Sequence, residues 1–483
     1  MTTTEHRTYG GWRRARAMGL FGLGFAQTLI VLAALTAALI TAAVSITATA
    51  IVGPVAAAIV LGNVARWDGV SLGQAIVHRA RWLAGAGRGH TTFRGGVMAP
   101  PEHAWDLPGV LAPTALLDTP AGYGVVWNRR LGTMTVTLRC AAQSTWLADP
   151  DAANAWVANW GGWLAGLGHV PTVRWTTVTV DTAPDAGTRL TDYITHRLAP
   201  GGPTAALRIL KHLVATAPQA AADVQTTVSI TFDPNASPAK PKSTVDRLAE
   251  IDRALPGLET SLSACGLTVL GRATATDLAA MVRQAFDPDI RGDLNLAGSD
   301  LMDWDNAGPV AAEEFPDRYQ HENATSVSWA WHEAPRQPVA HHILARLLAP
   351  GEHPKRVSLI YRPLTAGQAA AEVERQVNAA QFRSAYRRAR RLDPTARDVA
   401  DIEQAAAAAR EEALGAGLGL ISLWVTATVT DPALLDRAVA DIESRADACK
   451  VRLRRLWRSQ AAGFATTLPC GVCPPVLSGV WPH

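Results

Sequence analysis

The sequence contains no Asp, Glu, Lys or Arg between Arg16 and Arg66, a gap of 49 residues. A helix crosses a bilayer with roughly 20 mostly apolar residues, so the gap is long enough for two crossings and a short turn. A pair of buried core helices is a weaker interpretation, because helices of water-soluble proteins usually carry a polar face. The absence of charge therefore predicts a transmembrane helical hairpin over 20–64, with helices at about 20–41 and 45–64.

A cleaved signal peptide is another interpretation of the gap. Ala48-Thr49-Ala50 offers a small-residue cleavage site, but the apolar sequence continues to Leu61, whereas the apolar core of a signal peptide spans only about 7–15 residues. A turn at Gly53-Pro54 would leave too few residues for a second crossing. We therefore place the turn near 42–46 and expect Pro54 to bend the second helix, which membranes tolerate.

Both sides of the gap are basic, and the only acidic residues nearby are Glu5 and Asp68. Positively charged flanks remain on the cytoplasmic side of a membrane, so two basic flanks require an even number of crossings. We expect a multi-pass protein of the cell (inner) membrane, with the N-terminal residues 1–19 and the body after the hairpin both in the cytoplasm. The basic flanking residues are Arg7, Arg13, Arg14, Arg16, Arg66, Arg79, Arg81, Arg88 and Arg94.

Three further absences limit the function. The sequence has no G-x-x-x-x-G-K-[ST] motif, so it lacks the backbone cradle and the lysine that hold nucleotide phosphates. Its five cysteines are scattered, which excludes a disulfide scaffold and fits a reducing compartment. Its net charge is only +3, so the composition gives no reason to expect direct binding of nucleic acid. We predict no catalytic residue, no cofactor site and no metal site, and expect that the protein is not an enzyme.

Residues 65–113 are predicted to form an amphipathic helix followed by a linker. Over 70–83, apolar residues recur together with arginines and Trp82, a composition that suits a membrane surface. An ordinary connecting helix is the alternative. Residues 84–113 are rich in Gly, Pro and His and are interpreted as the linker. The tryptophans expected near a membrane interface are Trp12, Trp67 and Trp82.

From residue 114 the sequence alternates between strand and helix patterns, which indicates an α+β fold with ferredoxin-like halves. A first α+β domain is predicted over 114–286. Its sharpest strand is Thr226–Phe232, where apolar residues alternate with Thr and Ser as in a half-buried antiparallel strand. The other expected strands are Thr133–Arg139, Thr172–Val180 and Leu267–Leu270, and the expected helices are Ala152–Leu167, one that begins after Ser243, and Thr276–Phe286.

A polar, acidic stretch over 287–324 is predicted to be a loop or insertion. A second α+β region follows over 325–470, and its clearest strand is Leu420–Thr430. A basic helix over 365–391 and an acidic stretch from Pro394 carry complementary charges and predict a projecting helical hairpin, with a basic docking patch as the alternative. The remaining expected elements are strands 325–331, 356–361 and Cys449–Leu453, and helices 338–348 and one capped by Asp431-Pro432.

The strongest candidate for chemistry is Cys470-Gly471-Val472-Cys473, which adjoins the predicted C-terminal tail 471–483. Two cysteines at this spacing can bind zinc or form a redox pair. Zinc would need more ligands, and no second C-x-x-C exists. Pro474-Pro475 does not fit the helix that follows a redox pair, so two buried or idle thiols are favoured. Four histidines without a metal-binding spacing are assigned packing or surface roles. They are His321, His332, His341 and His342.

These features resemble a known arrangement. The start of the hairpin, Gly19–Leu23, and the segments Asp68–Leu72 and Arg79–Trp82 resemble the PrgI family of two-span membrane proteins from type IV secretion clusters. The rest of the chain resembles the N-terminal, non-motor domain of VirB/TraC-type conjugation ATPases. The segments that carry this second resemblance are Arg356–Pro363, Leu420–Thr430 and Gln460–Pro469.

The resemblance implies a component of actinobacterial conjugative elements. In that family the motor follows the Gln460–Pro469 segment, whereas this sequence ends at His483, so the ATPase is expected as a separate polypeptide. The implied role is an inner-membrane structural and docking component that contacts membrane lipid, the ATPase in trans and other secretion-channel subunits in an oligomeric assembly. The alternatives are a membrane component of a type VII secretion system, and a membrane-tethered thiol or metal protein that uses Cys470 and Cys473.

Overall fold

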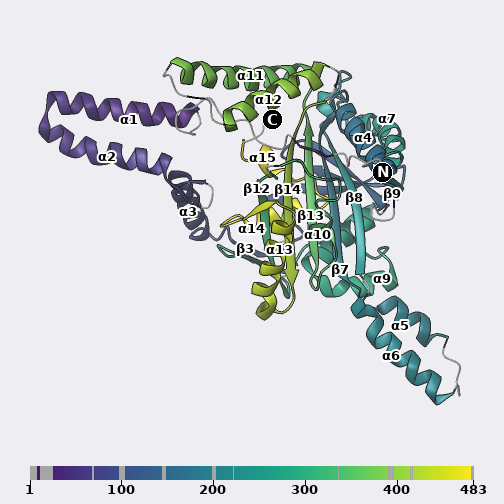
Figure 1. The fold of residues 1–483 in the computed structure, drawn as a ribbon. Coiled ribbons are helices and arrows are strands. Elements are labelled where there is room, and N and C mark those ends of the chain that lie inside the picture. Colours follow the sequence, from purple (N-terminus) through teal and green to yellow (C-terminus); the bar gives the residue numbers. More distant parts are fainter. Residues whose placement is uncertain are drawn as a thin grey trace, which may run out of the picture. The chain divides into compact units, whose positions relative to one another are not determined.

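The computed structural model describes most of the chain, and the described part forms two compact units (Figure 1). The sheet unit comprises Met1–Gly10, His90–Thr365 and Gly417–His483, and the helical unit comprises Gly11–Gly89 and Ala366–Ala416. The described residues are 8–10, 25–67, 70–96, 104–143, 148–185, 187–197, 203–220, 222–335, 337–389, 393, 396–413, 415 and 417–479.

The helical unit contains an N-terminal hairpin of two apolar helices, α1 (Phe25–Val44) and α2 (Ile46–Val64). Ser45 forms the turn, and its side chain accepts a hydrogen bond from the Ala48 N–H at the start of α2. The predicted apolar hairpin and the position of its turn are therefore confirmed, and Pro54 lies inside α2. The predicted start of the first helix near residue 20 lies outside the described residues.

The hairpin is followed by a short antiparallel strand pair and a third helix. The strands are β1 (Arg66–Trp67) and β2 (Val70–Ser71), and the helix is α3 (Leu72–Ala86). Ser71 caps α3 by accepting a hydrogen bond from the Gln74 N–H. The helix predicted over 70–83 is present, with both ends slightly later in the sequence.

A second helical hairpin in the same unit consists of α11 (Ala366–Ala389) and α12 (Ala396–Ala413). The Arg383 guanidinium of α11 lies 3.5 Å from the Asp401 carboxylate of α12, and both side chains are mostly buried. The helical hairpin that complementary charge predicted is therefore present, and the Arg383–Asp401 ion pair joins its two helices.

The sheet unit is built on one sheet of 13 strands, in which every pairing is antiparallel across the described residues. The strand order is β3-β10-β11-β12-β14-β13-β7-β8-β6-β5-β4, with β15 paired to β12 and β9 paired to β6. The strands are β3 (Thr92–Arg94), β4 (Thr114–Asp118), β5 (Gly124–Asn128), β6 (Thr133–Ala142), β7 (Val173–Pro184), β8 (Ala222–Phe232), β9 (Leu267–Arg272), β10 (Ala311–Glu314), β11 (Tyr319–His321), β12 (Ala324–Glu333), β13 (Lys355–Pro363), β14 (Gly419–Val429) and β15 (Arg452–Arg455).

Two parts of this sheet have the same order of elements. In the first repeat, β6-α4-β7-β8-α7-β9, the strands pair in the order β9-β6-β8-β7. In the second repeat, β12-α10-β13-β14-α13-β15, they pair in the equivalent order β15-β12-β14-β13. A helical hairpin separates the second and third strands of each repeat, α5–α6 in the first and α11–α12 in the second.

The helices of the sheet unit are α4 (Pro150–Leu167), α5 (Thr188–Thr195), α6 (Thr204–Ala220), α7 (Thr244–Ser263), α8 (Ala275–Phe286), α9 (Arg291–Ala297), α10 (Ala345–Leu348), α13 (Leu435–Ala448), α14 (Gln460–Thr466) and α15 (Pro474–Leu477). Side-chain caps explain some of their starts. Ser243 and Asp246 form the capping box of α7. Asp431 caps a short 3-10 turn that leads into α13, close to the predicted helix start.

The two α+β regions predicted over 114–286 and 325–470 each contain one repeat, but they are not separate sheets. Strand β7 of the first repeat pairs with β13 of the second, from Thr176↔Tyr361 to Thr182↔Lys355. The boundary could not be read from the sequence, because pairing between strands so far apart in the chain leaves no local pattern.

Several segments expected to be irregular are part of the sheet unit. Residues 287–324, predicted as a loop, contain α9, β10 and β11. The linker predicted over 84–113 contains β3, and Leu107 and Leu111 are buried in the core. These elements have only three to seven residues each, too few to show a periodic pattern. The helix expected over 338–348 is reduced to α10, and the closing strand β15 begins later than expected.

Candidate functional site

Hydroxyl side chains from both repeats line one face of the sheet, here called the hydroxyl face. They pair across neighbouring strands: the hydroxyl oxygens of Thr135 and Thr231 are 2.9 Å apart, and those of Thr179 and Ser358 are 2.7 Å apart. These pairs satisfy polar groups that have no access to water. All members of the hydroxyl face are buried: Thr135, Thr137, Thr179, Ser229, Thr231, Ser326, Ser328, Ser358, Thr426 and Thr428.

The hydroxyl face corrects the prediction for Thr226–Phe232. The alternation of apolar and hydroxyl residues indicated a strand with one face in solvent, but every residue of this stretch is buried. The same holds for most of β14, where Leu423 and Thr426 lie on opposite faces and are both buried. The alternating pattern is therefore real, but it separates an apolar interior from a polar interior.

A C-terminal segment, residues 460–473, covers the hydroxyl face. The side chain of Gln460 accepts a hydrogen bond from the Ser328 N–H at 2.7 Å. The Thr467 hydroxyl lies 3.2 Å from the Thr426 hydroxyl. An added Cβ at Gly463 would overlap the Ser328 side chain, so the glycine is needed for this close approach. The end of the chain is thus a structural part of the sheet unit.

The Cys470-Gly471-Val472-Cys473 motif lies within this covering segment. Both thiols are buried, and burial raises the pKa of each to about 12. Gly471 has a positive φ of 66° and packs against the Thr135 hydroxyl, where a side chain has no room. Among the described residues, no group of three or more His, Cys, Asp and Glu could hold a metal ion. The structure therefore supports two buried, protonated thiols in a packing motif.

Buried charges lie at the side of the hydroxyl face. Arg291 forms ion pairs at 3.1 Å with both Asp181 and Asp223. Arg356 donates a hydrogen bond to the Thr467 hydroxyl at 3.1 Å, and burial lowers the pKa of its guanidinium to about 10. A cavity of about 20 Å³ beside Arg356 has room for about one water molecule. These arginines were not predicted, because no local pattern separates a buried arginine from an exposed one.

The four histidines do not converge on one site. His321 is buried, with Nδ1 donating to the Phe286 carbonyl at 2.7 Å and Nε2 lying 2.8 Å from the Ser326 hydroxyl. Burial lowers the pKa of His321 to about 3, so the ring is neutral near pH 7. The rings of His341 and His342 pack edge to face, with their centroids 5.0 Å apart. His332 is exposed near the end of β12. The packing role predicted for these residues is confirmed for His321.

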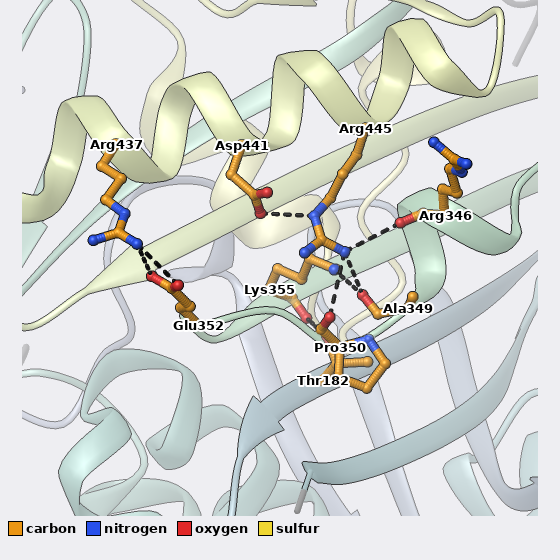
Figure 2. A network of polar contacts seen from close by, with 9 residues as sticks. All are labelled: Thr182, Arg346, Ala349, Pro350, Glu352, Lys355, Arg437, Asp441 and Arg445. Atoms are coloured by element: carbon orange, nitrogen blue, oxygen red, sulfur yellow. Dashed lines mark hydrogen bonds and ion pairs between the residues drawn. The ribbon is translucent and has the colours of Figure 1, made fainter. Parts of the chain in front are cut away.

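A polar network joins α13 to the loop before β13 (Figure 2). Arg445 Nη1 donates to the carbonyl oxygens of Arg346, Ala349 and Pro350 at 3.1–3.3 Å, and Arg445 Nε donates to Asp441. Figure 2 also shows Lys355, which donates to the Ala349 carbonyl. Burial lowers the pKa of Lys355 to about 8. The network ties the loop to α13, which is a structural role.

The apolar hairpin is the most distinctive surface of the described chain. Gln27–Val44 and Ile46–Val64 are long and apolar enough to cross a membrane, and almost none of their residues is buried within the protein. The next helix, α3, has no buried residue and carries Arg79, Arg81 and Trp82. Trp12 and the side chain of Trp67 lie outside the described residues. The structure thus contains two helices that could span a membrane, followed by a basic amphipathic helix. This part of the chain is the candidate site of contact with a membrane.

No protein-family model matches the chain, and no curated protein matches it.

Proposed function

We propose that this protein is a membrane-anchored docking subunit of a type IV, conjugation-type secretion machine, and that it recruits a separately encoded ATPase. The observation that carries the anchoring is the exposed apolar hairpin α1–α2, which is followed in the chain by α3 and then by a large α+β body. The basic residues on both sides of the hairpin support a multi-pass arrangement with both flanks in the cytoplasm of the inner membrane.

The assignment of the machine rests on the resemblance to PrgI-like membrane proteins and to the non-motor domain of VirB/TraC-type ATPases. The two βαββαβ repeats have the strand order of ferredoxin-like halves, which supports that part of the proposal. The sequence carries no P-loop motif, so the energy for secretion would come from the recruited ATPase. Anchoring and docking together would raise the local concentration of the ATPase at the membrane.

The structure bears differently on the two alternative functions, a type VII membrane component and a thiol or metal protein. A type VII membrane component would have the same two helices and remains a distinct outcome of the test. The thiol or metal enzyme loses its main support, because Cys470 and Cys473 are buried and their pKa values are raised, which disfavours the reactive thiolate.

The test is affinity purification of the tagged full chain from detergent-solubilised native membranes, with mass spectrometry of its partners. Recovery of a conjugation-type ATPase, followed by binding of that purified ATPase with or without nucleotide, is the expected result. Failure to bind the ATPase in either condition would overturn the docking role, and recovery of type VII components would move the protein to that machine. A Leu35→Arg/Val55→Arg variant is the matched control. It should lose the membrane but still bind the ATPase through its α+β body.

A further inference from the structure

The helical hairpin α5–α6 of the first repeat is a second candidate for contact with a membrane. It is inserted between β7 and β8, and the Thr188 hydroxyl at the start of α5 donates to the Gly292 carbonyl of α9 at 3.1 Å. Figure 1 shows α5 and α6 side by side, extending beyond α9 and away from the sheet. The hairpin therefore presents most of its surface to its surroundings.

Large apolar side chains are exposed on this hairpin. Ile209 is 67% exposed and Leu213 is 50% exposed, and their spacing of four residues places them on one side of α6. Leu210 and Val214 are half-buried on a different side of the helix. Tyr193 of α5 is 56% exposed. An apolar stripe remains exposed even though α6 has a second apolar side that is partly covered.

The charge carried by α6 is positive. Arg208 and Lys211 are exposed, and the whole of α6, residues 204–220, contains no Asp or Glu. The one acidic residue of α5, Asp192, lies 3.0 Å from His196. The equivalent hairpin α11–α12 of the second repeat differs, because its basic Arg383 is paired with Asp401 within the hairpin. Among the described residues, neither Arg208 nor Lys211 has an acidic partner, while Ile209 and Leu213 are exposed on the same helix.

We propose that α5–α6 docks on an anionic lipid surface, with Ile209 and Leu213 entering the interface and Arg208 and Lys211 contacting lipid phosphates. A helix with apolar residues on one side and Lys and Arg on the other has the composition of helices that lie in the plane of a membrane. This proposal rests on the proposed anchoring by α1–α2, since a tethered hairpin meets lipid at high local concentration. The occupant is lipid rather than an acidic protein because α6 carries exposed apolar residues on one side and basic residues, without any Asp or Glu, on the other side of the same helix.

The test uses the full chain in nanodiscs, labelled at Ile209→Cys with a dye whose emission shifts to the blue in an apolar environment. The background is Cys265→Ser, because the other four cysteines are buried. Discs of phosphatidylcholine are compared with discs that also contain phosphatidylglycerol. The matched control carries the dye at Val245→Cys, an equally apolar position that is 75% exposed on α7.

The expected result is a blue shift at position 209 in the anionic discs, and none at position 245. Arg208→Gln/Lys211→Gln should lower the equilibrium constant for docking about 25-fold, at about 5-fold for each basic residue near an anionic surface. Lys240→Gln/Lys242→Gln, which removes two exposed lysines elsewhere in the sheet unit, should have no effect.

Two results would overturn the proposal. One is a dye response that does not depend on anionic lipid, and the other is a response that requires the ATPase, which would make the surface a protein-docking site. Failure of the chain to stay in nanodiscs would instead contradict anchoring by α1–α2. The labelled chain would then be mixed with phosphatidylglycerol vesicles, and the absence of a blue shift there would overturn lipid docking as well.

Discussion

The apolar hairpin and the hydroxyl face distribute their side chains in opposite ways. In α1–α2, Val44 and Ile46 are 81% and 87% exposed. In the hydroxyl face, Thr137, Thr231 and Thr426 are completely buried. The hydrophobic effect favours the reverse of both arrangements in a water-soluble protein. The exposed apolar residues therefore need apolar surroundings, and the buried hydroxyls need hydrogen-bond partners.

The difference shows two solutions to the same problem. A helix satisfies its own backbone hydrogen bonds, so α1 and α2 need only apolar surroundings, which a bilayer would supply. The backbone of a strand needs hydrogen-bond partners on neighbouring strands. The buried hydroxyl side chains of the sheet likewise form hydrogen bonds with hydroxyls on other strands and in the C-terminal segment. The apolar hairpin therefore needs apolar surroundings outside the protein, whereas the hydroxyl face forms its hydrogen bonds within the protein.

The largest expected effect comes from placing charge in the apolar hairpin. Leu35→Arg/Val55→Arg puts one arginine near the middle of each helix, at a cost of about 3 kcal/mol per residue in a bilayer. The double variant should be released from membranes by alkaline carbonate, whereas the wild type should stay in the pellet. Val245→Arg at the exposed start of α7 should behave as wild type. Retention of the double variant would contradict the membrane assignment.

The next largest effect concerns the contact between the C-terminal segment and the hydroxyl face. Gly471→Ala forces an L residue into a positive φ and presses its Cβ onto Thr135, so unfolding in urea should show a loss of about 3 kcal/mol. Gly479→Ala is the matched control, because its φ of 69° is similar but nothing lies within 4 Å of the added atom. Its loss should be about 1 kcal/mol, from backbone strain alone. Equal losses would mean that the segment is not packed tightly on the sheet.

The smallest effect is a pH dependence from His321. Its pKa of about 3 in the folded state lies below the ordinary value of 6.5, so the unfolded chain binds more protons between these values. Stability should therefore fall as the pH falls below 6.5, by about 2 kcal/mol between pH 7 and pH 5 from this residue. His321→Gln should lack that part of the loss in urea unfolding, and His332→Gln, at an exposed position, should retain it. The same pH dependence in both variants would exclude His321 as its source.

Many helices and strands were predictable because their signals are local. The Ser243–Asp246 capping box, the alternation in Leu420–Thr430 and the complementary charges of α11 and α12 each depend on residues that are close in sequence. The short strands β3, β10 and β11 were missed because three or four residues are too few to show a periodic pattern, and β3 also pairs with β10 far later in the chain. The Cys470/Cys473 motif was the strongest candidate for chemistry in the sequence, and the burial of both thiols supports the favoured prediction of two buried or idle thiols.

The sequence by itself determined the apolar hairpin, because a run of 49 residues without charge is long enough for two apolar helices and a turn. It also determined the α+β character, since helix and strand periodicities are properties of neighbouring residues. The tertiary structure alone decided that two repeats share one sheet and that their hydroxyl residues face inward. The alternation of threonine and valine in the sequence is the same whether the threonine hydroxyl is exposed to water or hydrogen-bonded to another threonine. Only the fold brings Thr135 and Thr231 together.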